Sequence, residues 1–308
     1  MQLRRLGQTG IQIGAIGLGC GPMSRSNGPT DDDESTLSIH RALELGINFL
    51  DTAEDYGKDS HNESLIGKAL IGRRDKTIIC SKFGVYKSPD GERYFNGRPE
   101  NARRACDASL TRLAVDRIDL YYLHWLDPKV PVEDSIGAIG RLVEDGKVRS
   151  VGISNATADE LRRAHATHPI AALQSPYSLL HRQAEAELLP TCRSLRISFV
   201  AYHPLDSGAV GGTFYPSRGE RKKIPGARET AEIKRGKTLT RLQPLQDVAT
   251  VKGIPAAQVA LAWLLAQDEL IIPIPGTRRR RWLEENAAAT DVTLTAAELA
   301  KLDAAYPS

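Results

Sequence analysis

The sequence is poor in cysteine and carries little net charge, and each shortage excludes a class of protein. The 308 residues include four cysteines with no Cys-x-x-Cys pair among them: Cys20, Cys80, Cys106 and Cys192. This spacing argues against a disulfide framework and against a zinc site, so we expect reduced thiols in or near the core. Basic residues number 41 and acidic residues 38, which leaves a formal charge of +3. That charge is too small to indicate a nucleic-acid partner.

Long hydrophobic runs are also absent. The longest apolar stretch, residues 254–265, is interrupted by Pro255 and Gln258 and is far shorter than the roughly 20 residues that span a membrane. Arg4 and Arg5 near the start have no apolar segment behind them, unlike the basic residues of a secretory signal. We therefore expect a cytoplasmic protein with no membrane segment.

From about residue 15, short apolar runs alternate with longer segments of helical period. The expected strands are residues 15–19, 47–50, 77–80, 118–123, 148–153, 171–173, 197–201 and 270–272. The expected helices are residues 34–45, 63–71, 99–113, 132–144, 158–166, 185–195, 256–266 and 279–289. Such alternation, without a linker or a change of composition, favours a single (β/α)8 TIM barrel over residues 1–308. An open doubly wound sheet has similar local signals.

Three segments lie outside the eight strand-helix units. Residues 8–10 (Gln-Thr-Gly) are a turn signal that predicts an N-terminal β-hairpin, which could plug the bottom of the barrel. Thr295 and Glu298 form a capping-box pattern that predicts an extra C-terminal helix on the outside. Residues 203–237 are rich in glycine and basic side chains and have little periodicity, so we expect a long loop on the catalytic face.

Four polar residues lie at the ends of three successive predicted strands. Asp51 and Tyr56 follow the second strand, Lys82 follows the third, and His124 ends the fourth. Taken singly, each has an ordinary explanation as a turn residue, a surface aromatic, a solvated charge or a core histidine. The active site of a (β/α)8 barrel is built at the C-terminal ends of its strands. The coincidence of all four residues there therefore predicts a catalytic site.

These residues and their surroundings resemble the aldo-keto reductase family. The matching stretches are residues 46–57 (GINFLDTAEDYG), 119–124 (DLYYLH), 146–155 (GKVRSVGISN) and 275–277 (PGT). They follow one another in the family's order, so the resemblance covers essentially the whole chain. It implies a (β/α)8 barrel that reduces an aldehyde or ketone to an alcohol with NADPH, by hydride transfer to carbon.

The resemblance also implies a role for each of the four polar residues. Tyr56 is expected to give a proton to the oxygen that becomes negatively charged during hydride transfer. A free phenol, with a pKa of about 10, is a poor acid at neutral pH unless a nearby cation favours its phenolate. Lys82 is expected to be that cation, with Asp51 as its ion-pair partner. His124 is expected to hydrogen-bond the substrate carbonyl and set its angle to the nicotinamide.

Further residues match the family's contacts with the cofactor. Tyr202 matches the aromatic residue that stacks on the nicotinamide ring. The remaining matches are Ser154, Asn155 and Gln174 at the nicotinamide carboxamide, Leu205, Asp206 and Gly208 at the pyrophosphate, Gly276, Thr277 and Arg278 in the phosphate-binding loop, and Glu285 and Asn286 toward the adenine. The chain departs from the family at His203, where serine is common, and at Trp282, where arginine is usual. Cys20 and Trp125 are expected either to line the substrate pocket or to serve in the core.

The basic run at residues 278–281 (Arg-Arg-Arg-Arg) predicts the choice of cofactor. It enters the last barrel helix, where backbone N–H groups and the helix dipole favour a phosphate. NADPH carries a 2′-phosphate that NADH lacks, and the guanidinium fork suits that group. We expect Arg278 to be its partner because it lies nearest the loop, with Arg281 as the alternative because Trp282 replaces the usual arginine.

Two other functions fit part of this pattern. The same resemblance covers cofactor-binding regulatory subunits of the family that turn over slowly. A Schiff-base aldolase, in which Lys82 attacks a carbonyl, leaves Tyr56, Tyr202 and the loop at Gly276 unexplained. A small-molecule carbonyl substrate with NADPH explains all of these residues together.

Overall fold

Parallel strands form the centre of the computed structural model, which describes residues 1–24, 30–88, 90–208, 210 and 241–307. In sheet order, the barrel strands in these residues are β3 (Leu18–Gly19), β4 (Phe49–Asp51), β5 (Ile78–Phe83), β8 (Leu120–Leu123), β9 (Val151–Ser154), β10 (Ile170–Pro176), β11 (Ser198–Tyr202) and β12 (Ile271–Pro273). Each pairs in parallel with its neighbours. Residues 209 and 211–237 of the predicted loop lie outside the described residues.

The first and last strands meet and close the sheet. Gly17 N–H donates to the Pro273 carbonyl at 3.0 Å, and Gly19 N–H donates to the Pro275 carbonyl at 3.3 Å. Gly19 also forms a parallel bridge with Gly276. This seam needs glycine, because a Cβ at Gly276 would lie 2.7 Å from the Pro22 ring. The predicted (β/α)8 barrel is therefore confirmed.

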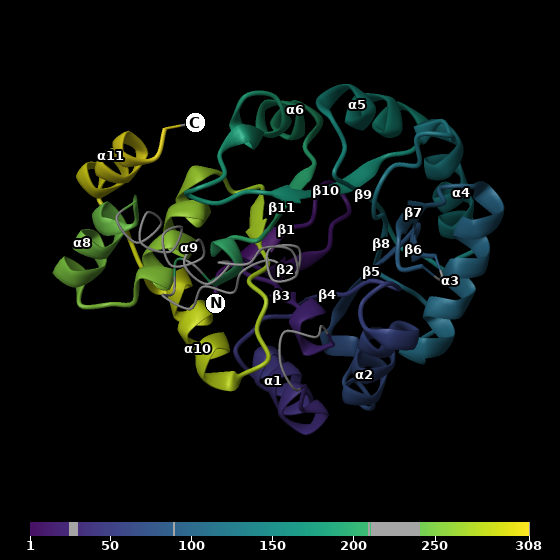
Figure 1. The fold of residues 1–308 in the computed structure, drawn as a ribbon, viewed down its shortest axis with the longest axis horizontal. Helices are drawn as coiled ribbons and strands as arrows, with labels where there is room; N and C mark the ends of the chain where they lie inside the picture. The colour runs from purple at the N-terminus through teal and green to yellow at the C-terminus, as the bar shows by residue number, and fades with distance from the viewer. Residues whose placement is uncertain (25–29, 89, 209, 211–240, 308) are drawn as a thin grey trace.

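Helices surround the barrel as an outer ring (Figure 1). The helices that follow the eight strands are α1 (Asp32–Glu44), α2 (His61–Ala69), α3 (Pro99–Leu113), α4 (Val132–Glu144), α5 (Ala158–Thr167), α6 (Leu188–Leu195), α9 (Ala256–Gln267) and α10 (Arg280–Ala288). Two of them, α3 and α4, have the predicted bounds. The predicted C-terminal helix is α11 (Ala296–Ala305), and it begins with the Thr295–Glu298 capping box. The helix α8 (Gln243–Lys252), which packs against α11, was not predicted.

Side chains of the strands point alternately into the barrel and out toward the helices, as the strand period of two requires. On β8, Leu120 and Tyr122 belong to the inner apolar cluster, whereas Tyr121 and Leu123 belong to the outer cluster beneath the helices. Gly152 on the neighbouring strand β9 leaves room for the Tyr122 ring, which would lie 2.4 Å from a Cβ there. The barrel is thus a filled core and not a pore.

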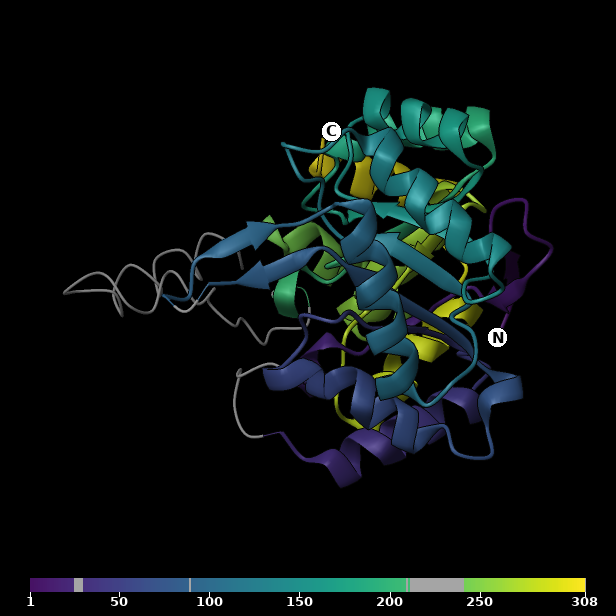
Figure 2. The same ribbon diagram turned by 90° about the vertical axis from the view of Figure 1, so that its right-hand side faces the viewer.

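Two short hairpins extend the barrel at opposite ends (Figure 2). The predicted N-terminal hairpin consists of β1 (Leu3–Arg5) and β2 (Gln12–Gly14). Its apolar residues Leu6, Ile11 and Ile13 are buried in the inner cluster, so it closes the bottom of the barrel. The second hairpin, β6 (Val85–Lys87) with β7 (Arg93–Phe95), follows β5 and was not predicted. It lies at the end where the catalytic residues were expected.

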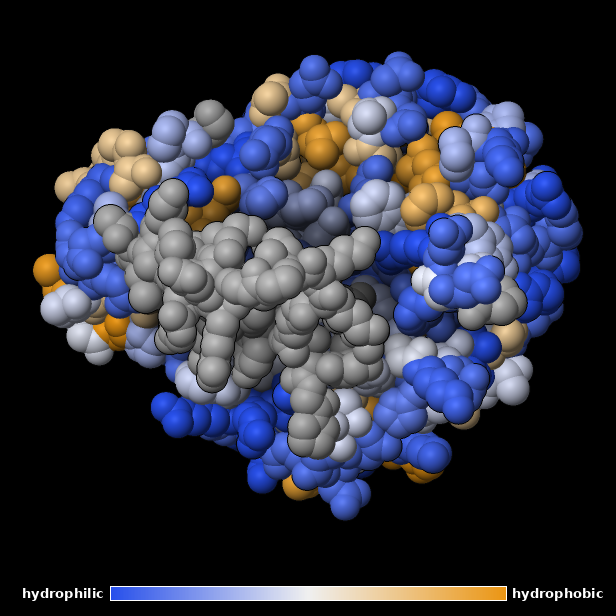
Figure 3. All heavy atoms as spheres, viewed as in Figure 1, coloured by the Kyte–Doolittle hydropathy of each residue, from blue (hydrophilic) through white to orange (hydrophobic). Residues whose placement is uncertain are grey.

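The surface and the cysteines agree with an ordinary globular domain. On the face shown in Figure 3, hydrophilic residues cover most of the outer helices, and apolar residues show only in small groups. All four cysteines are buried and unpaired, as predicted. In the part of the chain that the structure describes, no single helix is long and apolar enough to cross a membrane; α8 and α9 reach that length only as a pair bent by 98°.

Candidate active site

The four predicted catalytic residues meet at one edge of the barrel. Asp51 is the last residue of β4, Tyr56 lies in the loop that follows, and His124 comes directly after β8. Lys82 lies within β5, which runs three residues further than predicted because its pairing with β8 continues to Phe83. Since β4, β5 and β8 are neighbours in the sheet, their C-terminal ends bring these side chains together.

Lys82 is the centre of the cluster. Its Nζ donates to Asp51 Oδ1 at 2.5 Å, to the Thr52 carbonyl at 2.9 Å and to the Tyr56 hydroxyl at 3.4 Å. The lysine side chain is completely buried. The ion pair expected between Lys82 and Asp51 is therefore present, with the phenol of Tyr56 on the same ammonium group.

Electrostatics keep Lys82 charged in spite of its burial. Burial alone would lower the pKa of Lys82, because it disfavours the charged form, but the negative charge of Asp51 and the hydroxyl of Tyr56 outweigh this and raise that pKa. A permanent cation 3.4 Å from the Tyr56 oxygen stabilises the negative charge that the phenol acquires when it gives up its proton. The arrangement is chemically suited to proton donation by Tyr56.

Gln174, predicted to contact the nicotinamide carboxamide, is hydrogen-bonded to Asp51 in the structure. It lies inside β10, which extends to Pro176, and its Nε2 donates to Asp51 Oδ2 at 2.7 Å. Asp51 therefore has Lys82 on one oxygen and Gln174 on the other. In the described structure Gln174 supports the Lys82–Asp51 ion pair, and its contact with a nicotinamide carboxamide stays a prediction.

His124 is also buried, with 7% of its surface exposed. Burial lowers the pKa of His124, and the charge of Lys82 lowers it further, although Asp55 opposes both effects. The imidazole is therefore neutral at neutral pH. Its ring lies edge-on to Tyr56, with 5.9 Å between the ring centroids.

The predicted nicotinamide contacts form one connected group beside the catalytic cluster. Tyr202, the last residue of β11, donates its hydroxyl to Asn155 Oδ1 at 2.8 Å. Asn155 Nδ2 donates to the His124 carbonyl at 3.1 Å and to Ser154 Oγ at 2.9 Å. These bonds fix the half-buried ring of Tyr202. A fixed aromatic face next to amide and hydroxyl groups fits a nicotinamide ring and its carboxamide.

The residues expected at the pyrophosphate follow β11. Asp206 and Gly208 bound a short 3-10 turn, and Gly208 N–H donates to the Leu205 carbonyl at 3.0 Å. Leu205 is partly buried against the outer core. Burial raises the pKa of the Asp206 carboxyl. His203, which replaces the usual serine, is exposed.

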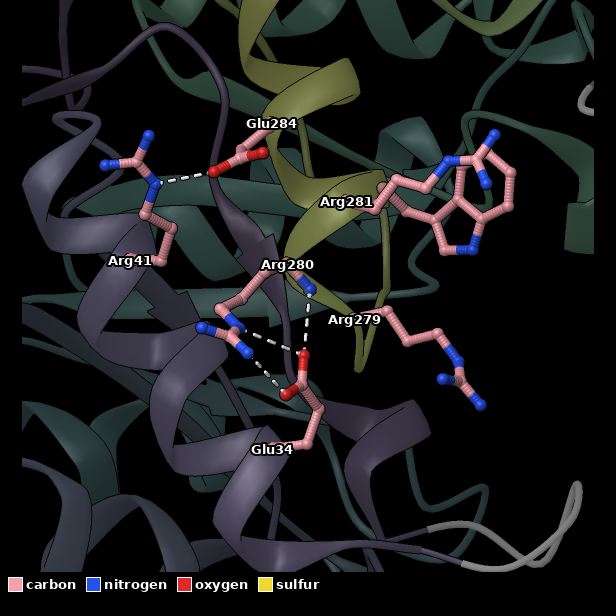
Figure 4. Close-up of a pocket in the computed structure, with 7 residues that line it drawn as sticks. Glu34, Arg41, Arg279, Arg280, Arg281 and Glu284 are labelled. Atoms are coloured by element: carbon pink, nitrogen blue, oxygen red, sulfur yellow. Dashed lines mark hydrogen bonds and ion pairs between the residues drawn. The ribbon is translucent and has the colours of Figure 1, made fainter.

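The start of α10 carries the basic run, and a hollow of about 660 Å³ opens between α1 and α10 (Figure 4). None of the four predicted catalytic residues lines it. Its walls are Glu34, Arg41, Arg279, Arg280, Arg281, Trp282 and Glu284. Arg280 is paired there with Glu34, with 3.1 Å between its nitrogen and Oε2. The Arg281 guanidinium lies over the Trp282 ring, 4.7 Å from its centroid.

The other predicted cofactor residues of this loop and of α10 differ in burial and in their hydrogen bonds. Thr277 Oγ1 accepts the Arg279 N–H at 3.2 Å, and Arg278 is partly buried. Gly276 forms part of the barrel seam. Farther along α10, Asn286 is buried and Glu285 is half-buried, with its pKa raised by burial. Helix N-terminal amides next to arginines suit a phosphate group.

Comparison with known proteins identifies the family. The model of the aldo/keto reductase family matches residues 15–307. A probable aldo-keto reductase of Glycine max is 38% identical over 309 residues, which cover 98% of this chain and 88% of that protein. The chain therefore belongs to the aldo-keto reductase family. The members of this family are NAD(P)H-dependent oxidoreductases that act on small-molecule carbonyl compounds, so the predicted enzyme class and cofactor are confirmed at that level.

Solved structures are similar over almost the whole length. A glycerol dehydrogenase from Gluconobacter oxydans has a TM-score of 0.86 at 27% identity and covers 98% of this chain and 94% of its own. A thermostable aldo-keto reductase in complex with the inhibitor epalrestat has a TM-score of 0.80 at 30% identity, with coverages of 99% and 100%. An aldo/keto reductase from Klebsiella pneumoniae in complex with NADP and acetate has a TM-score of 0.78 at 27% identity, with coverages of 100% and 96%.

Several residues that the structure places at the site were not predicted. Asp55 contacts His124, and Arg93 on the unpredicted hairpin contacts Asp55. Asp90-Gly91, a hairpin turn signal between two aromatic-rich stretches, could have revealed this hairpin. Trp125 is partly exposed and stacks on Phe95 of the hairpin. Cys20, the other pocket candidate, is completely buried and belongs to the core.

Glu54 is a further carboxyl next to the site, and it is half-buried. Its Oε1 accepts the Gly84 N–H at 2.9 Å, and burial raises the pKa of Glu54 to about 7, whereas an unfolded glutamate titrates at about 4.3. Because the folded pKa is the higher one, the stability that Glu54 contributes is complete below about pH 4.3 and is lost as the pH rises through 7.

We expect Glu54→Gln, which is neutral at every pH, to stabilise the protein in alkaline solution. Its free energy of unfolding relative to the wild type should be on the order of 2 kcal/mol higher at pH 8.5 than at pH 5. Urea unfolding at the two pH values measures this difference. Glu92→Gln, at an exposed position, is the control and should show no such change. An effect of Glu54→Gln that is the same at both pH values would contradict the assignment.

Proposed function

We propose that this protein reduces an aldehyde or ketone to an alcohol with NADPH, and that Tyr56 is the general acid. The contact of Lys82 Nζ with both Asp51 and Tyr56 is the observation that supports this most. It joins a proton donor to a buried cation at the C-terminal edge of the barrel. A tyrosine that is only a surface aromatic does not require contact with a buried ammonium group.

Each residue then has one task in the reaction. NADPH, when bound, supplies the hydride that attacks the carbonyl carbon. Tyr56 gives its proton to the carbonyl oxygen, and Lys82 stabilises the phenolate that remains. Asp51 keeps Lys82 charged and oriented, while Gln174 holds Asp51. His124 contacts the substrate oxygen and sets its angle.

The proposal is tested by steady-state oxidation of NADPH with a panel of aldehydes and ketones. Many turnovers per protein molecule are expected with at least one class of substrate. A single burst of one NADPH per protein molecule would instead indicate a cofactor-binding regulatory subunit. A covalent adduct trapped on Lys82 by borohydride would indicate an aldolase.

We also propose a cytoplasmic location without nucleic-acid or membrane partners.

A preference for NADPH over NADH follows from the arginines at α10. Arg278 is the expected partner of the 2′-phosphate because it lies nearest the loop, and Arg281 is the alternative. Arg280 is already paired with Glu34. A charge-assisted hydrogen bond contributes on the order of 1.5 to 3 kcal/mol, so Arg278→Ala or Arg281→Ala should weaken NADPH binding about 10- to 150-fold. Binding of NADH should be nearly unchanged, because it has no 2′-phosphate.

Titration of protein fluorescence with each cofactor gives the dissociation constants. Arg280→Ala is the matched control from the same run, and we expect it to change NADPH affinity by less than about threefold. Equal affinities of the wild-type protein for NADPH and NADH would refute the preference, whatever the variants do.

A further inference from the structure

Arg93 is an exposed cation beside the candidate active site. It lies on β7, in the hairpin that projects from the end of the barrel where the candidate catalytic residues lie (Figure 2). Its guanidinium is 5.6 Å from the ring centroid of Trp125, the residue that follows His124. One of its nitrogens is 3.8 Å from Oδ2 of Asp55, the residue before Tyr56. The hairpin therefore brings a positive charge to the edge of the site.

The guanidinium of Arg93 has donors to spare. An arginine carries five N–H donors. Within the described part of the chain, the Arg93 side chain makes no hydrogen bond, because its separation of 3.8 Å from Asp55 is longer than a hydrogen bond. The side chain is 48% exposed. Asp55 thus offsets part of the charge but leaves the N–H groups available to a molecule that enters the site.

The charge of Arg93 also acts at the expected nicotinamide end of the site. Burial raises the pKa of the Tyr202 hydroxyl, whereas the positive charge of Arg93 opposes that rise. Lys82, the buried cation of the site, has its charge matched by Asp51 at hydrogen-bond distance. Arg93 has no contact this close, so its charge is the less compensated of the two.

A flat apolar surface adjoins this cation. The ring of Phe95, two residues after Arg93 on β7, stacks on Trp125 with 5.9 Å between the centroids and 20° between the planes. Both rings are partly exposed. Arg93 and Phe95 lie on the same face of the hairpin, since side chains alternate along a strand. A cation next to two aromatic rings suits a small molecule with an apolar body and an anionic end.

Resting on the proposed function, we propose that Arg93 is a specificity-determining residue for carbonyl substrates that carry a carboxylate at the end remote from the carbonyl group. The planar guanidinium fork matches a carboxylate with two parallel N–H···O bonds. A singly charged carboxylate fits better than a phosphate dianion, because Asp55 beside Arg93 repels each additional negative charge. The apolar middle of the substrate contacts Trp125, and its carbonyl group lies at Tyr56.

The test compares aldehydes that have nearly the same shape but differ in charge. One pair is aromatic, p-carboxybenzaldehyde and p-carbamoylbenzaldehyde, and the other is flexible, adipic semialdehyde and its amide. The measured quantity is the ratio of kcat/KM for the carboxylate to kcat/KM for the amide. Arg93→Gln should lower this ratio about 5- to 30-fold in at least one pair. Arg93→Lys keeps the charge and should lower it less than about threefold.

Arg104→Gln is the matched control. The Arg104 guanidinium lies over the ring of Tyr86, 6.0 Å from its centroid, and Tyr86 precedes Lys87, the register partner of Arg93. Because side chains alternate along a strand, this arginine serves the opposite face of the hairpin. Its removal should change the ratio by less than about twofold.

Asp55→Asn should change the ratio in the opposite direction. It removes the negative charge next to Arg93, so it should raise the preference for the carboxylate a few-fold. A general loss of activity in this variant cancels in the ratio, because both aldehydes of a pair share it. A purely structural role of Arg93 would lower both rates equally. An unchanged ratio in Arg93→Gln for both pairs would overturn the proposal.

A binding measurement needs no turnover. Isothermal titration calorimetry of the NADPH-saturated protein uses p-(hydroxymethyl)benzoate and p-(hydroxymethyl)benzamide, alcohols that cannot react with the reduced cofactor. Arg93→Gln should weaken binding of the benzoate about 5- to 30-fold and leave binding of the benzamide nearly unchanged. Absence of turnover with every aldehyde would refute the proposed function, whereas unchanged benzoate binding in Arg93→Gln would overturn this inference, so the two failures are distinguishable.

Discussion

Replacing Tyr56 with phenylalanine is expected to lower kcat for aldehyde reduction by about 100- to 10,000-fold, the range for a positioned general acid. The substitution keeps the aromatic ring and removes only the hydroxyl that lies 3.4 Å from Lys82. The carbonyl oxygen would then receive no proton from the protein, while the ring contact with His124 would remain possible. Affinity for NADPH should change little, because the hydroxyl belongs to the reaction and not to cofactor binding.

Single-turnover oxidation of bound NADPH measures the chemical step directly. Tyr94→Phe, which removes a hydroxyl from an exposed tyrosine, is the control and should leave the rate unchanged within about twofold. Near-normal turnover of Tyr56→Phe would contradict the assignment of the proton donor.

The second large effect concerns Lys82 and Asp51, which should act as one unit. Removing one partner of a buried ion pair leaves an uncompensated charge and costs about 3 to 5 kcal/mol of stability. Lys82→Met leaves Asp51 with the amide of Gln174, and Asp51→Asn leaves the ammonium group with the Thr52 carbonyl and Tyr56. Each variant should lose stability and reduce slowly, since the phenolate is no longer stabilised by a fixed cation.

The double variant provides the decisive comparison. It removes both charges at once, so its losses in unfolding free energy and in log kcat should be much smaller than the sums of the single losses. Urea unfolding and single-turnover kinetics of the four proteins complete the cycle. Lys68→Met, at an exposed site on α2, is the control, because it replaces a lysine with methionine without breaking the Lys82–Asp51 ion pair. Additive losses would show that the two residues work independently.

The barrel was predictable because its signals are local and repeated. The bounds of α3 and α4 follow from amphipathic period and clear helix starts, and the eight apolar runs correspond to the eight barrel strands. Strand ends were less predictable, because β5 and β10 continue through polar residues that pair with neighbouring strands. The pairing with neighbouring strands determines where those strands end, and a local sequence pattern does not show this pairing. The helix α8 was missed because it buries only three residues, Leu245, Val248 and Ala249.

The grouping of the four candidate catalytic residues was predictable for a related reason. Asp51, Tyr56, Lys82 and His124 each lie at or near the end of a barrel strand, and barrel topology alone brings those ends together. The contacts of Asp55 and Gln174 were not predictable, because they depend on which way a side chain turns at the rim. The ion pair of Arg280 was not predictable for the same reason. Glu34 lies on α1, far away in the sequence, and it pairs with only this one of the four consecutive arginines.

We propose that this chain transfers a hydride from NADPH to a carbonyl carbon repeatedly. The most direct test uses NADPH with deuterium at the transferred position and an aldehyde, followed by mass spectrometry of the product. We predict an alcohol with one deuterium on the former carbonyl carbon, in large molar excess over the protein. An alcohol without carbon-bound deuterium, or a yield that never exceeds one molecule per protein molecule, would show that the protein does not catalyse this transfer.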